Sequence, residues 1–249
     1  MQKLAETVHT ISIAGYSLHY RTVGAGTPLV LLHGYGVSGR IWQKTLPYVA
    51  QHHQVFVVDL PGHGYSTYIS PWQLRNMAPL LAAWLRQLYL PPVALLGQSM
   101  GGAIAIHLAA CAPELVGRLI LVNAAGIPLR TGLPGLVIRS VHSFFQPGNG
   151  IYPPELWRDV LRPRPRLFWQ AAREVARNDF RAELASITTP TLIIWGECDV
   201  LIPLSLAYEL QAALPHALLV TLPGCGHRPM LAQPELFSGV VLEFLREEI

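Results

Sequence analysis

Cysteine is scarce in this sequence, with three residues among 249. Cys111, Cys198 and Cys225 lie far apart, and no pair has the short spacing typical of zinc ligands. An odd and sparse set also argues against a framework of disulfide bonds. We therefore expect no metal site and no disulfide-dependent fold, and the cysteine content fits a reducing compartment.

Charged residues are scarce as well. They make up 13% of the chain, against 51% hydrophobic residues, and this composition excludes a disordered chain. The 18 basic and 15 acidic residues leave a formal net charge of +3. That excess is too small to indicate nucleic-acid binding. We expect a globular protein with no nucleic-acid partner.

Long uninterrupted hydrophobic runs are also missing. The stretch 103–122 comes closest, but His107, Pro113, Glu114 and Arg118 interrupt it. A membrane-spanning helix needs about 20 predominantly apolar residues. The first ten residues lack the apolar core of a signal peptide. We therefore expect a cytoplasmic protein without stable membrane insertion.

Short hydrophobic runs do occur, and they alternate with longer stretches of helical periodicity. Continuous runs of this kind are typical of strands that are covered on both faces in a parallel sheet. The earlier runs 10–13 and 18–23 are separated by Ala14 and Gly15, which predicts an antiparallel hairpin at the sheet edge. The other predicted strands are 28–32, 55–58, 93–96, 119–122, 191–195 and 217–221.

Prolines mark several predicted helix starts. The clearest helical pattern begins at Ser70, which opens a capping-box pattern and is followed by Pro71 at a position typical of the first helical residue. Pro79 inside this pattern predicts a kink. Pro203 and Pro234 are predicted to open two later helices at first-turn positions.

One segment, 127–186, breaks the alternation because it shows no clear strand. It holds nine arginines, no lysine and five acidic residues, a charge of +4 that leaves −1 for the rest of the chain. We interpret it as a helical cap (lid) inserted into a core formed by 1–126 and 187–249. Its arginines fit an acidic partner, such as an acyl carrier protein or an anionic substrate, and equally a solvated helical face.

The strongest local motif is GQSMGG at 97–102, between a predicted strand and a predicted helix. A strand-to-helix turn this sharp strains the backbone of its central residue, and small residues on either side relieve the crowding. The hydroxyl of Ser99 is therefore expected to stand clear of the backbone at the carboxyl end of a strand, where ligands bind in open parallel sheets. The adjacent helix N-terminus offers free amide donors.

A serine hydroxyl needs a base before it can act as a nucleophile. His227, in the loop after the last predicted strand, is the best candidate, and Asp199 is the best carboxylate to orient it. Glu197 is the rival for that second role. Cys198 and Cys225 flank these residues in sequence. We interpret them as small residues packed in loops, with a redox switch as the alternative.

A glycine-containing loop, LHGYG at 32–36, follows an early predicted strand. Its glycines allow the backbone to approach a ligand closely. The backbone N–H groups of Tyr35 and Met100 are expected to form an oxyanion hole, in which each donor is typically worth ~10²–10³ in rate.

Taken together, these motifs resemble the α/β-hydrolase superfamily over nearly the whole chain. The resemblance implies a core of about eight mostly parallel strands flanked by helices, with a helical cap inserted after the sixth strand. It also implies a cofactor-free hydrolase that acts on carboxylic esters or related bonds. The motifs are 33–36, 59–66, the turn at Ser99, 196–199 and 226–227, in the order typical of the family.

Some branches of the superfamily fit less well. Ser99 stands where haloalkane dehalogenases and epoxide hydrolases carry an aspartate. Carbon–carbon bond hydrolases usually have Gly-Pro-Gly after the His-Gly pair and Trp after the catalytic histidine, whereas this chain has 35–37 (YGV) and Arg228. Other members of the superfamily carry the acid of the triad after the strand that precedes the cap. This chain has Asn123 there, which favours Asp199 as the acid.

We therefore expect a serine carboxylesterase-type hydrolase that turns over small to medium hydrophobic esters through an acyl-enzyme. Its site would comprise Ser99, Asp199 and His227, with the backbone N–H groups of Tyr35 and Met100. Alternatives within the fold are a cofactor-free perhydrolase, a carbon–carbon bond hydrolase and a carrier-protein methyl esterase. The non-enzymatic alternative is a member of the superfamily that binds a ligand without turning it over.

Overall fold

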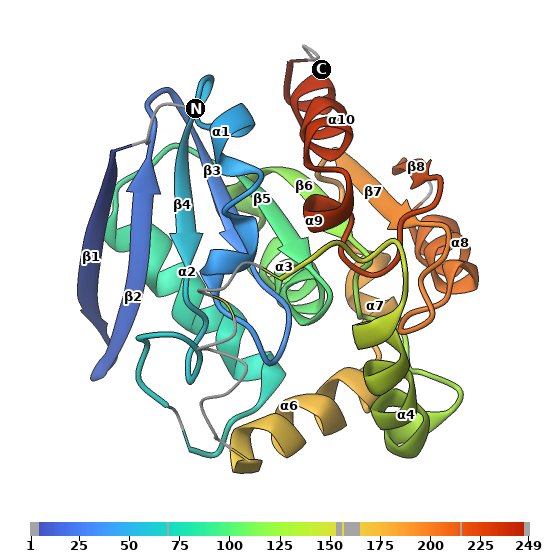
Figure 1. Ribbon diagram of the computed structural model, residues 1–249. Coiled ribbons are helices and arrows are strands. Elements are labelled where there is room, and N and C mark those ends of the chain that lie inside the picture. The colour runs from blue at the N-terminus through green and yellow to red at the C-terminus, as the bar shows by residue number, and fades with distance from the viewer. Residues whose placement is uncertain (1–4, 69, 153–155, 157–164, 215, 247–249) are drawn as a thin grey trace.

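The strands form a single sheet in the order β1-β2-β4-β3-β5-β6-β7-β8 (Figure 1). β1, β2 and β4 pair antiparallel, and all later neighbours pair parallel. The structure is a computed structural model that describes residues 5–68, 70–152, 156, 165–214 and 216–246. The strands are β1 (Glu6–Ile13), β2 (Tyr16–Val23), β3 (Thr27–Leu32), β4 (His53–Val58), β5 (Val93–Gln98), β6 (Val116–Val122), β7 (Thr191–Gly196) and β8 (Leu218–Leu222).

The fold class predicted from the sequence, an α/β-hydrolase fold, is confirmed. The edge hairpin is present and longer than predicted, because pairing continues from Ile13↔Tyr16 to Glu6↔Val23. Its turn residues, Ala14 and Gly15, have φ of 50° and 83°. Positive φ at both central positions is the geometry whose twist matches a two-residue hairpin.

Helices cover both faces of the sheet, which makes a three-layer α/β/α molecule. Side chains alternate between the faces: Val30 and Leu32 of β3 join one buried cluster with α2, α3 and α8, whereas Leu29 and Leu31 join another with α1 and α10. The helices are α1 (Leu46–Val49), α2 (Met77–Gln87), α3 (Met100–Cys111), α4 (Gly132–Phe145), α6 (Pro165–Arg177), α7 (Arg181–Leu184), α8 (Leu204–Ala213), α9 (Pro229–Ala232) and α10 (Pro234–Arg246), with 3₁₀ turns η1 (Gly39–Trp42), η2 (Leu74–Asn76) and η3 (Pro113–Leu115).

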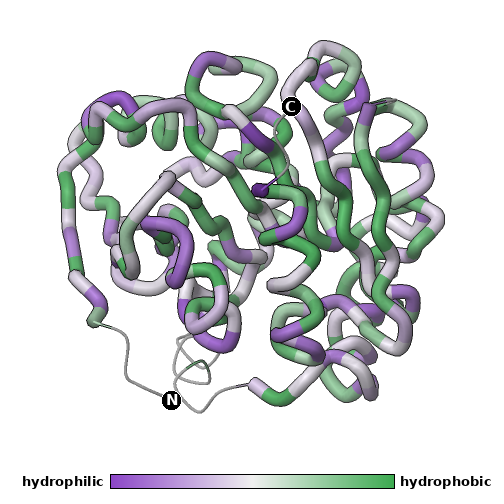
Figure 2. The backbone as a smooth tube through the Cα atoms, turned by 90° about the horizontal axis from the view of Figure 1, so that it is seen from above, coloured by the Kyte–Doolittle hydropathy of each residue, from purple (hydrophilic) through white to green (hydrophobic). Residues whose placement is uncertain are grey.

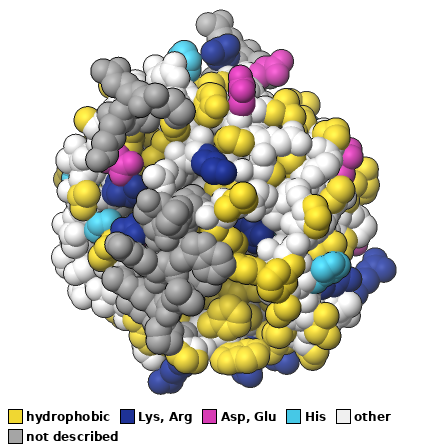
Figure 3. Space-filling view, viewed as in Figure 1, with side chains coloured by type: hydrophobic (Ala, Val, Ile, Leu, Met, Phe, Trp, Pro, Cys, Tyr) yellow, Lys and Arg dark blue, Asp and Glu magenta, His cyan; other side chains and the backbone are white. Residues whose placement is uncertain are grey.

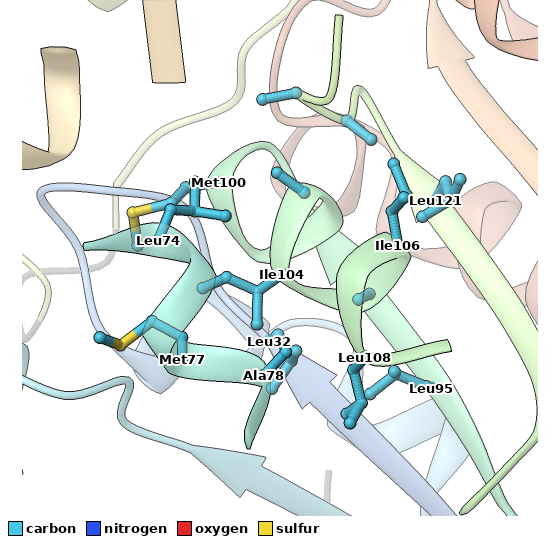
Figure 4. Packing of buried hydrophobic residues seen from close by; sticks show 14 of the residues in the cluster. Leu32, Leu74, Met77, Ala78, Leu95, Met100, Ile104, Ile106, Leu108 and Leu121 are labelled. Atoms are coloured by element: carbon cyan, nitrogen blue, oxygen red, sulfur yellow. The ribbon is translucent and has the colours of Figure 1, made fainter. Parts of the chain in front are cut away.

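α3 lies in the centre of the first cluster. Its side chains pack against α2 and the sheet, so the helix is apolar nearly all round (Figure 4). Along the described chain, hydrophobic stretches alternate with short hydrophilic ones in helices and strands alike (Figure 2). This packing fixes the N-terminus of α3 at the end of β5.

Among the described residues, no helix is both long and apolar enough to span a membrane.

The segment 127–186 contributes α4 and α6, which contact each other and lie beyond the carboxyl ends of β3, β4 and β5 (Figure 1). α7 contacts α3 and α8 instead. Residues 153–155 and 157–164 of this segment lie outside the described residues, so the limits of the inserted cap stay a prediction.

The helix predicted to begin at Ser70 begins later, so that prediction is wrong. The side chain of Trp72 is buried and donates from Nε1 to the carbonyl of Pro61 at 3.0 Å, and this holds the segment as a loop until η2. Tertiary burial outweighs the local capping pattern here. Pro79 is consequently the third residue of α2, where a missing N–H costs little, so the basis for the predicted kink disappears.

The two later prolines differ from each other. Pro234 is the first residue of α10, as predicted. Pro203 is the residue before α8 rather than its first residue, because its ψ of 147° is extended. Helix starts are therefore displaced by a single residue at Pro203 and by several residues after Ser70.

Candidate active site

Ser99 occupies a sharp turn between β5 and α3, with φ of 54° and ψ of −118°. The neighbouring glycines are required by contact, because a Cβ on Gly97 would lie 2.4 Å from the carbonyl oxygen of Gly101. A Cβ on Gly101 would lie 2.5 Å from the carbonyl oxygen of Leu32. Such backbone strain typically costs about 1–3 kcal/mol and persists where the surroundings fix it. The predicted turn geometry is therefore present at Ser99.

His227 and Asp199 form a buried pair. Nδ1 of His227 lies 2.7 Å from Oδ2 of Asp199. The carboxylate also accepts hydrogen bonds from Nδ2 of Asn123 at 2.7 Å and from the backbone N–H groups of Leu201 and Ile202 at 2.7 and 3.0 Å. Each oxygen of Asp199 thus has two donors, which fix the carboxylate in orientation.

Glu197, the rival acid, lies elsewhere. Its side chain is exposed and accepts a hydrogen bond from Oγ1 of Thr221 at 3.0 Å. The carboxylate that contacts His227 is that of Asp199. Asn123, which the sequence suggested only as a position lacking an acid, supplies an amide that holds Asp199.

Ser99 and His227 line the same cavity, of about 140 Å³. One wall comes from the end of β5 and the segments after β3, β5, β7 and β8, and the other from α4, α6 and the loop after α4. Most of the lining is apolar or aromatic, as is usual for small-molecule sites. The lining residues are Gly34, Tyr35, Gly36, Val37, Ile41, Gln98, Ser99, Ser140, Ser143, Phe144, Tyr152, Phe168, Leu201, His227 and Arg228.

The side chain of Gln98 contacts Nε2 of His227, the ring nitrogen that does not face Asp199. Its Nε2 lies 3.1 Å from the backbone carbonyl of His227 and 3.1 Å from Nε2 of the same residue. A carbonyl only accepts, so the amide nitrogen must face it and donates to both atoms. The ring of His227 is thereby oriented with Nδ1 toward Asp199 and Nε2 toward Gln98. For catalysis, the Nε2 lone pair must exchange Gln98 for Ser99.

The sequence did not single out Gln98, although it directly precedes Ser99. Its role depends on a contact with a residue 129 positions later. No local motif encodes such a contact. The close packing is visible at Gly34, where a Cβ would lie 2.5 Å from Oε1 of Gln98.

The predicted oxyanion donors lie at two element ends. Met100 is the first residue of α3, and Tyr35 belongs to the loop after β3 that lines the cavity. Within the described part of the chain, neither N–H has a hydrogen-bond acceptor. The hydroxyl of Tyr35 is bonded to Oγ of Ser140 in α4, and burial raises its pKa. The loop that carries the first donor is thus tied to the cap.

Asp59 supports the neighbouring loop through three hydrogen bonds. It accepts hydrogen bonds from Nδ1 of His19 and from the backbone N–H groups of Gly39 and Tyr65, each at 3.0 Å. Burial alone would raise the pKa of Asp59, but these bonds and the electrostatic interaction with His33 lower it to about 2. Asp59 is therefore ionised and holds the start of η1 next to the cavity.

The cysteines near the pair pack as parts of loops. The backbone N–H of Cys198 donates to the carbonyl of Cys225 at 2.8 Å. Cys225 is buried, and that burial raises its pKa to about 11. Thiols that stay protonated react slowly. Across the described ranges, no group of three or more His, Cys, Asp or Glu side chains could hold a metal ion.

Residues 29–240 match the Alpha/beta hydrolase family. The chain belongs to this family. The matched range includes Ser99, Asp199, His227 and both predicted oxyanion donors.

Curated relatives carry a common name. A pimeloyl-[acyl-carrier protein] methyl ester esterase of Nitrosomonas europaea is 31% identical, over 89% of this chain and 96% of the relative. A protein of the same name from Vibrio parahaemolyticus is 30% identical, over 93% of this chain and 99% of the relative. These relatives are named as esterases, which supports the interpretation of this chain as a hydrolase.

Solved structures agree in fold. A hydrolase from Pseudomonas aeruginosa superposes with a TM-score of 0.83 at 27% identity, covering 96% of this chain and 98% of the other. An esterase from Exiguobacterium antarcticum has a TM-score of 0.86 at 22% identity, covering 96% and 99%. At 22% identity, the similarity to the esterase from Exiguobacterium antarcticum shows the fold alone.

Proposed function

We propose that this chain is a serine hydrolase that cleaves methyl esters of acyl groups carried on acyl carrier protein. The observation that carries the chemistry is the 2.7 Å contact between Asp199 and His227, beside a cavity that Ser99 also lines. The names of the curated relatives support the carrier-bound methyl ester. They favour this alternative over the free hydrophobic ester expected first from the sequence.

Acylation begins when His227 accepts the proton of Ser99 at Nε2. The serine oxygen attacks the ester carbonyl, and the oxyanion lies against the N–H groups of Tyr35 and Met100. Asp199 keeps the proton on Nδ1 and stabilises the imidazolium that forms. His227 then gives its proton to the departing alcohol, which leaves an acyl group on Ser99.

Deacylation repeats the sequence with water. His227 removes a proton from water, the hydroxide adds to the acyl carbonyl, and the same N–H groups hold the second oxyanion. The proton then returns to Ser99 as the carboxylic acid leaves. The cavity of about 140 Å³ suits a short alcohol as the leaving group.

The cap surface supports a macromolecular carrier. Arg166, Arg173 and Arg177 are exposed on α6, and their spacing of seven and four residues puts them on one side of the helix. Hydrophobic side chains gather over the same part of the molecule, where Figure 1 places α4 and α6 (Figure 3). The exposed ones are Ile138, Val141, Phe145, Phe168 and Trp169. A basic and apolar surface fits an acidic carrier.

The test is hydrolysis of a methyl ester of a dicarboxylic acyl group attached to acyl carrier protein, followed by mass spectrometry. We expect wild-type protein to remove the methyl group and Ser99→Ala to remove none. Labelling of Ser99 by a fluorophosphonate, lost in Ser99→Ala, is the matched readout of nucleophilicity. Equal rates for the two proteins would overturn the proposal. Equal kcat/KM for the carrier-bound ester and the free methyl ester would mean that the enzyme does not recognise the carrier protein.

A further inference from the structure

Arg228 is a buried cation in the wall of the candidate catalytic cavity. It follows His227 directly, and its side chain is only 6% exposed. Its backbone N–H donates to Oδ1 of Asn149 at 3.2 Å, and Nη2 donates to the carbonyl of Ser143 at 3.0 Å. The guanidinium lies 4.6 Å from the ring centroid of Tyr152.

The contacts that the structure describes give the charge of Arg228 no directly paired counter-ion. Among the described residues, no carboxylate lies within ion-pair distance of it, and its Nε is buried without a hydrogen-bond acceptor. Burial lowers the pKa of Arg228, whereas Tyr152 and Asp199 raise it, and an arginine remains charged in proteins. A desolvated charge with unsatisfied donors is strongly unfavourable unless a partner supplies acceptors.

The rest of the cavity wall supplies no such partner. Of the described residues that line it, none is acidic, and Arg228 is the only arginine or lysine. The neighbours are mainly glycine, aliphatic and aromatic residues, and a low-polarity wall strengthens the attraction between Arg228 and an anion. The guanidinium offers a fork of N–H groups that matches the oxygens of a carboxylate or phosphate.

We propose that Arg228 determines substrate specificity by binding an oxyanion, a carboxylate or a phosphate, on the substrate beside the reacting ester. The proposal goes beyond the proposed function, because the acyl chain of a carrier-bound methyl ester carries no free carboxylate beside the reacting ester. It rests only on the serine hydrolase chemistry of that function. It differs from the exposed arginines of α6, which would meet a carrier protein on the outside. The substrate class is an ester that carries a second, negatively charged group within reach of the cavity.

The first experiment compares p-nitrophenyl esters of equal length, one ending in a free carboxylate and one in a methyl group. For Arg228→Met, we expect kcat/KM for the anionic ester to fall roughly tenfold to a hundredfold, because a charge-assisted contact is lost. The neutral ester should keep its kcat/KM within about threefold, since no charge is then left unpaired. Arg228→Lys should recover part of the preference.

The matched control is Arg86→Gln, which removes one positive charge from α2, where Arg86 pairs with exposed Glu114. Its anionic-to-neutral ratio should equal that of the wild type. An unchanged ratio in Arg228→Met would overturn the proposal. Equal losses for both esters in a protein with wild-type circular dichroism would also overturn it, because they indicate a structural role.

A binding measurement separates this inference from the proposed function. Calorimetry with glutarate, with inorganic phosphate and with neutral glutaramide needs no turnover. We expect wild type and Ser99→Ala to bind at least one of the anions but not the amide, and Arg228→Met to bind neither anion. Glutarate binding assigns the site to a carboxylate and phosphate binding to a phosphate. Binding of neither anion by wild type would reject the proposal, even if the esterase activity is present.

Discussion

Asp199 and Glu197 are two residues apart, yet only one of them is surrounded by donors. Asp199 is buried among an imidazole, a side-chain amide and two backbone N–H groups, whereas Glu197 is exposed beside Thr221. The chemistry of the site therefore depends on which carboxylate the loop after β7 turns inward.

Asp199→Asn should preserve this geometry and remove the charge. The amide can donate to His227, which then holds its proton on Nε2, the tautomer that cannot accept from Ser99. We expect kcat for an ester substrate to fall by up to ~10⁴, with KM changed little. Steady-state kinetics with a p-nitrophenyl ester measure both constants.

Glu197→Gln is the matched control for that substitution. It removes the same charge two residues away, at a residue that is not among the described residues lining the cavity. Its kcat should stay within about twofold of wild type, as for surface substitutions away from special features. A similar loss in both variants would mean that Asp199 does not orient His227.

At the same scale, the sequence predicted the residues with local signatures and missed those defined by distant contacts. Ser99 and His227 stand in glycine-rich motifs that only a few backbone geometries explain. Gln98 and Asn123 have ordinary surroundings in sequence, and their partners His227 and Asp199 are 129 and 76 positions away. Side-chain networks of this kind become visible only when the strands are placed side by side.

At the scale of elements, the hydroxyl contact between Tyr35 and Ser140 joins α4 to the loop after β3. Tyr35→Phe and Ser140→Ala each break it while leaving the Tyr35 backbone N–H in place. We expect each to lower kcat/KM several-fold, and the double variant to lose no more than either single one. Ester kinetics on the three proteins form the cycle, and additive losses would show that the contact does not couple cap and loop.

The turn after β4 depends on ionised Asp59. Its pKa of about 2 lies below the ordinary 3.8, so its contribution to stability is full above pH about 4 and is lost as pH falls toward 2. Asp59→Asn should lower the free energy of unfolding by about 2 kcal/mol at neutral pH. Urea unfolding at about pH 7 and about pH 3 measures it, and the difference between the two proteins should shrink to roughly half at the lower pH. A difference independent of pH would contradict the ionised role.

Element starts were the least predictable part of the fold. The run after Ser70 carries a valid capping pattern, but the burial of Trp72 holds this segment as a loop, and the helix begins after η2. The continuous apolar runs of the central strands were reliable because both faces of the sheet are covered. Local capping is weaker than the burial of one indole, so propensity alone does not place a helix start.

At the scale of the whole molecule, two kinds of region face the proposed substrate. The sheet and its helices position the reacting groups, and α4 and α6 lie across the carboxyl ends of the strands with exposed arginines and hydrophobic side chains (Figures 1 and 3). The sequence showed this division as a change in charge, from −1 outside 127–186 to +4 within it. It did not show which arginines face outward and which one, Arg228, lines the cavity.

This asymmetry predicts different salt dependences for two kinds of substrate. Between about 50 and about 500 mM salt, kcat/KM for a carrier-bound methyl ester should fall several-fold, because screening weakens attraction between exposed charges. A small neutral ester should change little over the same range. Substituting Arg166, Arg173 and Arg177 together by Gln should remove most of the salt dependence and leave the small ester unaffected. A carrier-bound ester that is equally insensitive to salt would mean that the basic side of α6 does not meet the carrier.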